Sequence, residues 1–278
     1  MGQTVLEILF APALVALATL VGRRWGAHVG GLVSAFPAVV GPVLLIIAQQ
    51  RGALAAARAA SATLLGLVAL SGFALAYARA ARGMRWPASL AAGWACAVAA
   101  AALAGWSLAG AGLPAALSAA VLSIAAARSA LPRSAAQPDL GASQAAPRGD
   151  VVLRMALTAA LIVLLTGASE LFGPVVGGML AALPVLASVL AVFTHRLHGS
   201  DATIGLLGGM LTGMSGFVAF CAAIALLAAP AGTAVAFAVA TLCAVAAQAL
   251  VLRGQAGLTT TRVHRAATPC SASEASSA

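Results

Sequence analysis

Titratable side chains that could do chemistry are few in this sequence, and the densest group of them follows residue 194. His195 and His198 are three residues apart and Asp201 comes next, a spacing at which two side chains can share one helical face and bind a metal ion. A clear third ligand is missing from the sequence around them. We therefore interpret the run as a polar connection between helices and predict no metal site.

The sequence contains none of the short motifs that mark common enzyme sites. A phosphate-binding G-x-x-x-x-G-K-[ST] run, a zinc-binding H-E-x-x-H run and a G-x-S-x-G nucleophile turn are all missing from it. No nucleophile is visible beside a general base, which covalent catalysis would require. We therefore predict that the chain is not an enzyme, has no catalytic residue and needs no cofactor.

The very apolar composition of the chain predicts what kind of fold carries these residues. Of the 278 residues, 62% are hydrophobic and 8% are charged, and the mean hydropathy is +1.05. A soluble domain has about 25% charged residues, so a soluble fold could not cover this much apolar surface. The composition excludes a soluble enzyme, a disordered chain and a disulfide scaffold. It predicts an all-α protein that crosses a membrane many times.

Apolar runs of the length that crosses a bilayer, about 20 residues, recur along the whole chain. Glycines, prolines and charged residues stand between the runs and predict where the helices end. The two most polar stretches, 132–150 and 253–278, are predicted to be a mobile loop and a flexible tail. The nine predicted membrane-spanning segments are 4–22, 28–48, 54–78, 87–108, 111–131, 151–169, 173–194, 203–228 and 231–252.

The 15 basic residues are all arginines, and their positions predict how the protein is oriented. With nine crossings, 13 arginines fall on one side of the membrane, and only Arg51 and Arg58 fall on the other. Basic loops stay in the cytoplasm, so we expect the N-terminus outside and the C-terminus inside. The lack of lysine suggests a GC-rich bacterial genome and thus the bacterial inner membrane. We expect the lipid bilayer as a partner and no nucleic acid.

Two stretches that lie 147 residues apart share a pattern of glycines and a proline. Residues 26–37 and 173–184 both follow the frame G-x-x-x-G-G-[LM]-[VL]-[SA]-A-[FL]-P, and the Ser-Gly-Phe of 71–73 recurs at 215–217. Five crossings separate equivalent points, and this odd number requires the two copies to insert in opposite directions. The sequence therefore predicts an inverted repeat. The predicted domains are a first four-helix half at 1–108, a linker helix and loop at 109–150, a second half at 151–252, and the tail at 253–278.

Each copy of the pattern places a proline near the middle of a predicted membrane helix. Pro37 lies in the second helix and Pro184 in the seventh, and each should kink its helix because proline has no amide hydrogen to donate. The carbonyls that a kink frees can line a water-filled cavity at membrane depth. The sequence leaves two interpretations open, simple helix packing or a substrate site formed by the prolines with Ser34 and Ser188.

The glycines of the repeated pattern, and those of the eighth predicted segment, indicate close contacts between helices. A residue without a side chain lets a second backbone approach, and Gly205, Gly209 and Gly213 recur every four residues on one helical face. The glycines predicted to serve helix packing are Gly26, Gly30, Gly31, Gly173, Gly177, Gly178, Gly209 and Gly213.

Charged residues near membrane depth are candidates for function because burying a charge there is costly. Arg58 lies about one turn inside the third predicted segment, where it could bind an anionic group or extend its long stem to the membrane surface. Glu170 could pair with Arg51 or Arg58 or exchange protons, or it could be a solvated carboxylate. We include Arg58 among the predicted substrate-binding residues.

The run Gly31-Leu32-Val33-Ser34-Ala35-Phe36-Pro37, followed by Arg51-Gly52, resembles the GlpM-like family of small bacterial inner-membrane proteins. Those proteins have four spans and a GL-x-x-x-F-P type of motif. The second copy is similar to related four-span domains, although His198-Gly199 replaces the Arg-Gly pair. The resemblance implies tandem four-span repeats and a link to alginate production, and it supplies no catalytic residue.

These observations lead to two hypotheses of different classes. The first is an inner-membrane transporter of a small neutral or singly charged solute, with alternating access around kinked helices 2 and 7. The second, from the family resemblance, is a non-transporting accessory protein that supports envelope or exopolysaccharide (alginate-like) biosynthesis. The construction also looks like that of fused dual-topology proteins, so a homodimer is a candidate assembly. A hydrated cavity bounded by both prolines would favour transport, and a dry interface the accessory role.

Overall fold

The computed structural model describes residues 2–37, 40–107, 110, 112–133, 151–161, 163–164 and 184–266, and this part of the chain is helical without strands. Long runs of alanine, leucine and valine favour helix, and glycine or proline interrupts them. Five of the described helices are long and apolar enough to cross a membrane, so the prediction of an all-helical protein with membrane-spanning helices is confirmed at that level. The helices are α1 (Gly2–Trp25), α2 (Ala27–Ser34), α3 (Val40–Arg51), α4 (Ala53–Ala80), α5 (Trp86–Ser107), α6 (Leu113–Ala130), the short apolar helix Val151–Leu161, α8 (Val185–Ala231) and α9 (Thr233–Ala266).

The helix α8 consists of two helices joined at Gly199, which has φ 80° and ψ −175°. Only glycine adopts this backbone conformation readily, and the chain bends there. Phe193, before the bend, and Leu206, after it, belong to one buried cluster, so the two parts pack side by side. The bend lies in the polar run around His195 and His198, which agrees with its interpretation as a connection between helices.

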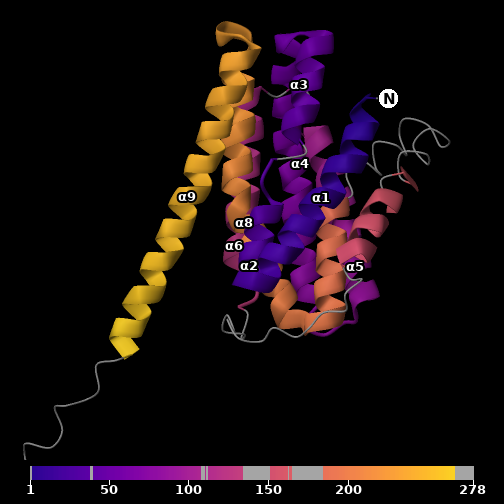
Figure 1. The fold of residues 1–278 in the computed structure, drawn as a ribbon, viewed down its shortest axis with the longest axis vertical. Coiled ribbons are helices and arrows are strands. Elements are labelled where there is room, and N and C mark those ends of the chain that lie inside the picture. The colour runs from indigo at the N-terminus through magenta and orange to yellow at the C-terminus, as the bar shows by residue number, and fades with distance from the viewer. Residues whose placement is uncertain are drawn as a thin grey trace, which may run out of the picture.

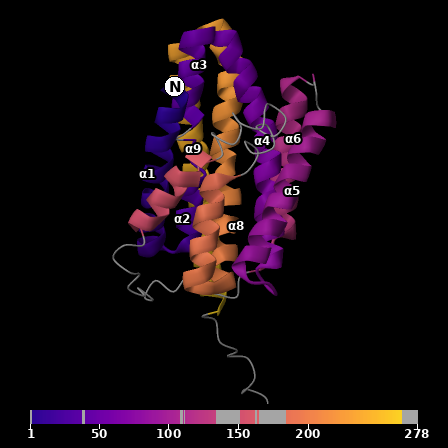
Figure 2. The same cartoon turned by 90° about the vertical axis from the view of Figure 1, so that its right-hand side faces the viewer.

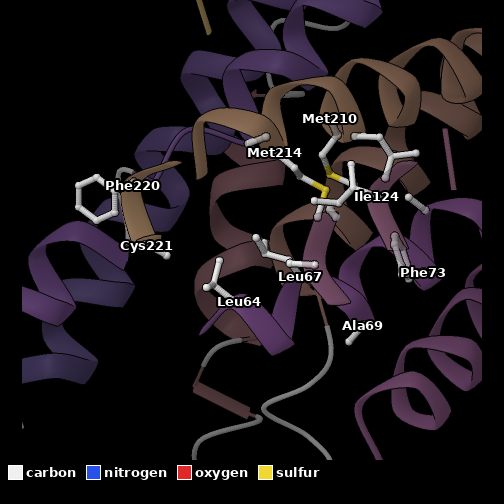
Figure 3. Packing of buried hydrophobic residues seen from close by; sticks show 14 of the residues in the cluster. Leu64, Leu67, Ala69, Phe73, Ile124, Met210, Met214, Phe220 and Cys221 are labelled. Carbon is white, nitrogen blue, oxygen red and sulfur yellow. The ribbon is translucent and has the colours of Figure 1, made fainter. Parts of the chain in front are cut away.

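The two parts of α8 lie in the middle of the bundle, between α1 and α2 on one side and α4, α5 and α6 on the other (Figure 2). The main hydrophobic core lies where α4, α6 and α8 meet. Figure 3 shows Met210 and Met214 of α8 gathered with Ile124 of α6 and Leu67 of α4, and all four are buried. The helix α9 packs mainly on α8 and lies at the outside of the bundle (Figure 1).

Several helix ends meet at the lower end of the bundle in Figure 1, around the bend of α8. The hydroxyl of Tyr77, near the end of α4, lies 3.4 Å from Nδ1 of His195. The guanidinium of Arg196 lies 5.5 Å from the ring centre of Trp86, the first residue of α5. The start of α4, with Arg58, lies at the opposite end, because a helix of 28 residues is about 42 Å long. The arginines after α4 and α6 therefore share an end from which Arg58 is far away.

The structure differs from the predicted segments at Pro37, at Pro184, which precedes a helix where a kink within one was predicted, and after residue 252. The segment 28–48 is not one helix but two, α2 and α3, separated around Pro37. The helix α9 continues to Ala266, well into the stretch predicted to be a flexible tail. Residues 165–183, with Glu170, Gly173, Gly177 and Gly178, lie outside the described residues, as do 134–150 and 267–278.

Candidate functional site

The chain around Pro37 ends one helix before it starts the next. The amides of Ala35 and Phe36 donate to carbonyls three residues back, those of Leu32 and Val33, which tightens the last turn of α2. The hydroxyl of Ser34 donates to the Gly31 carbonyl at 2.6 Å. A proline amide cannot extend this ladder, so the helix ends where the sequence predicted only a kink. Ser34 and Pro37 are both buried at this interruption.

Pro184 lies immediately before α8, with φ −79° and ψ 77°, so it too stands outside a helix. Its carbonyl accepts two hydrogen bonds from Ser188, one from the amide and one from the hydroxyl, both at 2.8 Å. The Ser188 hydroxyl in turn accepts a hydrogen bond of 2.8 Å from the indole N–H of Trp94 on α5. This buried serine therefore links α5 to the start of α8 through an interhelical hydrogen bond. The same position is also compatible with contact to a solute.

Pro37 and Pro184 stand in matching local geometry. The Gly41 amide donates to the Pro37 carbonyl at 2.9 Å, just as the Ser188 amide donates to that of Pro184 at 2.8 Å. Farther on, Gly52 has φ 86° and ψ 166°, and Gly199, 147 residues later, has φ 80° and ψ −175°. Both glycines separate the helix that follows the proline from the next helix.

The repeated Ser-Gly-Phe also performs the same task at both places. The hydroxyls of Ser71 and Ser215 each donate to the carbonyl three residues back. A Cβ atom on Gly72 would lie 3.3 Å from Cys96 of α5, and one on Gly216 would lie 3.0 Å from the Ala244 carbonyl of α9. Each glycine thus lets the following helix pack closely against its own.

The helices α2 and α8 cross in direct backbone contact. A Cβ atom on Gly31 would overlap the Leu206 carbonyl, and one on Gly209 would overlap the carbonyl of His28. A Cβ atom on Gly213 would lie 2.5 Å from the Leu32 carbonyl oxygen. Gly30 lies against α1 in the same way, whereas Gly26 meets no described atom and has φ 92° at the start of α2. The crossing leaves no room for a solute between α2 and α8.

A hollow of about 310 Å³ lies beside Pro184, between α4, α5 and the middle of α8. The hydroxyl of Thr63 on its wall is already bonded to the Ala59 carbonyl. No titratable side chain is among the described residues of its lining, so the hollow suits an apolar or uncharged group. Its described lining is Thr63, Leu65, Gly66, Leu67, Ala69, Leu70, Ala101, Gly105, Pro184 and Phe217.

The predicted substrate-binding residues are only partly brought together. Pro184 lines the hollow and Ser188 lies one turn farther along α8, whereas Arg58 is exposed on α4 and lies outside the lining. Ser34 and Pro37 lie at the other helix interruption, and no hydrogen bond among the described residues joins them to Pro184 or Ser188. The hollow is therefore bounded by one of the two prolines.

The described lining of the hollow contains no charged residue. No group of three histidine, cysteine or acidic side chains that could hold a metal ion occurs in the described ranges. Arg154, in Val151–Leu161, is 3% exposed and its guanidinium lies 4.8 Å from the ring centre of Phe193. The side chain of this arginine is therefore packed against α8 inside the bundle.

Sequence reasoning missed Trp94 and Tyr77, the aromatic residues that bond to α8. Each lies in an apolar helix and carries a polar atom that needs a partner when it is buried. That requirement was a readable signal, but a sequence does not name the partner. In the structure the partner of Trp94 is Ser188, and the partner of Tyr77 is His195.

Comparison with known proteins adds no constraint to the site. The chain matches no protein-family model, no curated protein and no solved structure.

Proposed function

We propose that this chain is a bacterial inner-membrane transporter for a small neutral or singly charged solute. It has nine crossings, two inverted halves and alternating access around the helix interruptions at Pro37 and Pro184. The observation that carries the proposal is the matching geometry 147 residues apart, in the hydrogen bonds to the two proline carbonyls and in the conformations of Gly52 and Gly199. Interrupted helices facing each other in inverted halves are a common way to build a transport site.

The inversion is supported by where the equivalent glycines lie. Gly52 precedes α4, whereas Gly199 comes four residues after His195, which contacts Tyr77 near the end of α4. Equivalent points therefore stand at opposite ends of one helix. The arginines gathered after α4 and α6 lie at the Gly199 end, which we assign to the cytoplasm on the basis of the positive-inside rule.

The hollow beside Pro184 is the substrate site of this proposal. Its wall is apolar and its described residues carry no charge, which favours a neutral or amphiphilic solute over a multiply charged one. The carbonyl of Pro184, held by Ser188, is a fixed polar group at its edge. The exposed Arg58 has no direct part in this site.

Access of water to the hollow tests the proposal before any solute is known. After all four native cysteines are replaced, Ala101→Cys puts a thiol on the wall of the hollow and Ala125→Cys puts one on the exposed face of α6. A membrane-impermeant maleimide should label position 101 from one side of intact vesicles and leave position 125, which faces lipid, unlabelled. A thiol at 101 that stays unreactive from both sides would mean a dry hollow and would support the accessory role.

Solute flux is the second arm of the test. Proteoliposomes with the full chain should take up members of a panel of radiolabelled neutral solutes and monovalent organic anions. Ala101→Leu fills the hollow and should reduce this uptake several-fold, whereas the same change at the outward Ala125 should leave it within about twofold. Equal losses in the two variants, or no uptake by the unmodified protein, would contradict the transporter proposal.

A further inference from the structure

A second hollow, of about 480 Å³, lies at the ends of α4 and α6 and is surrounded by arginines. Arg82 comes just after α4, Arg128 lies in the last turn of α6, and Arg133 follows that helix. All three side chains are exposed, and Arg82 is 46 residues before Arg128 in the sequence. The other lining residues are Ser129, Leu131 and Pro132.

Hydrogen bonds hold these segments together without neutralising the charge. Nη2 of Arg82 donates to the Arg133 carbonyl at 2.8 Å, and Nη2 of Arg79 donates to the Ala130 carbonyl at 3.3 Å. A guanidinium has five N–H groups, so Arg82 keeps donors for another partner. Asp201, the acidic residue whose side chain the structure describes, is not among the lining residues. Three arginines thus line one space.

The position of the hollow indicates what these charges meet. It lies directly after the ends of Ala53–Ala80 and Leu113–Ala130, two helices apolar and long enough to cross a membrane. Val121 and Leu122 are 48% and 67% exposed, and they lie seven residues before Arg128 and Ser129, on the same face of α6. An apolar stripe on α6 therefore leads up to the arginines, at the depth where lipid headgroups begin.

We propose that Arg82, Arg128 and Arg133 bind the phosphate headgroup of an anionic phospholipid, with an acyl chain along Val121 and Leu122. Arginine binds phosphate through two parallel N–H···O bonds, and basic pockets at helix ends are suited to anionic headgroups. A free phosphate ion would use the arginines but not the exposed stripe of α6. This site is independent of the hollow beside Pro184 and of solute transport.

Electron spin resonance of spin-labelled lipids tests the assignment on the full chain in phosphatidylcholine membranes. The unmodified protein should bind spin-labelled phosphatidylglycerol more tightly than spin-labelled phosphatidylcholine. Arg128→Gln, which breaks no hydrogen bond seen here, should lower this selectivity roughly fivefold, and Arg128→Lys should restore most of it. The triple variant R82Q/R128Q/R133Q should lose the selectivity almost completely.

The matched control removes three other exposed arginines, in the variant R24Q/R85Q/R253Q, which has the same net charge as the triple variant. It should keep most of the selectivity, and an equal loss would mean that only net charge matters and would overturn the site. Millimolar inorganic phosphate at constant ionic strength should compete weakly. If it abolishes the selectivity, the hollow binds free phosphate and the lipid assignment is wrong. Absence of selectivity in the unmodified protein would also overturn it.

Discussion

Gly213 on α8 and Gly66 on α4 are separated by the repeat offset of 147 residues, and their surroundings differ. A Cβ atom on Gly213 would lie 2.5 Å from the Leu32 carbonyl oxygen and 3.0 Å from Cβ of Ala35, because α2 packs directly on α8 there. A Cβ atom on Gly66 would meet no described atom within 4 Å, and Gly66 lines the hollow beside Pro184. One position is closed and its counterpart faces a hollow.

The unequal surroundings of Gly213 and Gly66 indicate how the two copies of the repeat can form one transport site. A carrier with inverted halves closes one half while the other is open, and access changes when the halves exchange conformations. In our proposal the crossing of α2 and α8 is the closed contact between the two halves, and the hollow beside Pro184, between α4, α5 and α8, is the open one. Variants that fill or loosen either place should therefore have unequal effects.

The largest effect is expected from adding one methyl group to each of the two glycines. Gly213→Ala should destabilise the protein by about 1 to 3 kcal/mol, since the new Cβ would press on the backbone of Leu32. Gly66→Ala should be neutral or stabilising by up to about 1 kcal/mol, because alanine favours a helix over glycine. Thermal unfolding of the purified protein in detergent measures both. A Gly66→Ala variant as unstable as Gly213→Ala would mean that both positions are packed alike.

A smaller effect is expected at the hydrogen bond that holds the edge of the hollow. Trp94→Phe and Ser188→Ala each break the 2.8 Å contact between the indole nitrogen and the hydroxyl. A double-mutant cycle should give a coupling energy of about 0.6 kcal/mol, the average for hydrogen bonds between membrane helices, and at most about 1.7 kcal/mol. Ser61→Ala removes a hydroxyl that bonds only within its own helix and serves as the control. A coupling energy near zero would mean that Trp94 does not stabilise the edge of the hollow through Ser188.

The smallest effects are expected at Gly72 and Gly216, the glycines of the repeated Ser-Gly-Phe. At Gly216 a Cβ atom would lie 2.7 Å from Cγ of Gln248 and 3.0 Å from the Ala244 carbonyl, so Gly216→Ala should cost about 1 kcal/mol. At Gly72 the nearest atom is the thiol sulfur of Cys96, 3.3 Å away on a side chain that can turn, so Gly72→Ala should change stability by less than about 0.5 kcal/mol. Unfolding temperatures in the same detergent compare them, and a reversed order would contradict this packing.

Much of the fold could be predicted from the sequence because apolar length and glycine placement are local signals. The long helices follow from runs of apolar residues, and the repeated pattern with Pro37 and Pro184 pointed to where helices are interrupted. The sequence did not predict that the helix ends near Pro37; it predicted only a kink there. A proline allows either outcome, because both a kink and a helix end follow from its missing amide hydrogen.

The site was less predictable than the fold, because it depends on contacts between distant segments. Ser188 was a candidate from its place after Pro184, but its partner Trp94 lies 94 residues earlier. Arg58 was a candidate because it is charged near membrane depth, yet it lies exposed on the surface. The exposure of a long side chain depends on which helix face its neighbours cover, and the sequence does not specify that.

If the two halves are inverted, residues at equivalent positions face opposite sides of the membrane, and one matched pair tests this directly. Gln50 and Leu197 are both exposed, are 147 residues apart, and each lies two residues before a glycine bend. In a cysteine-free background, Gln50→Cys and Leu197→Cys should react with an impermeant maleimide from opposite sides of the membrane, position 197 from the cytoplasm. Labelling of both thiols from the same side would contradict the inverted arrangement.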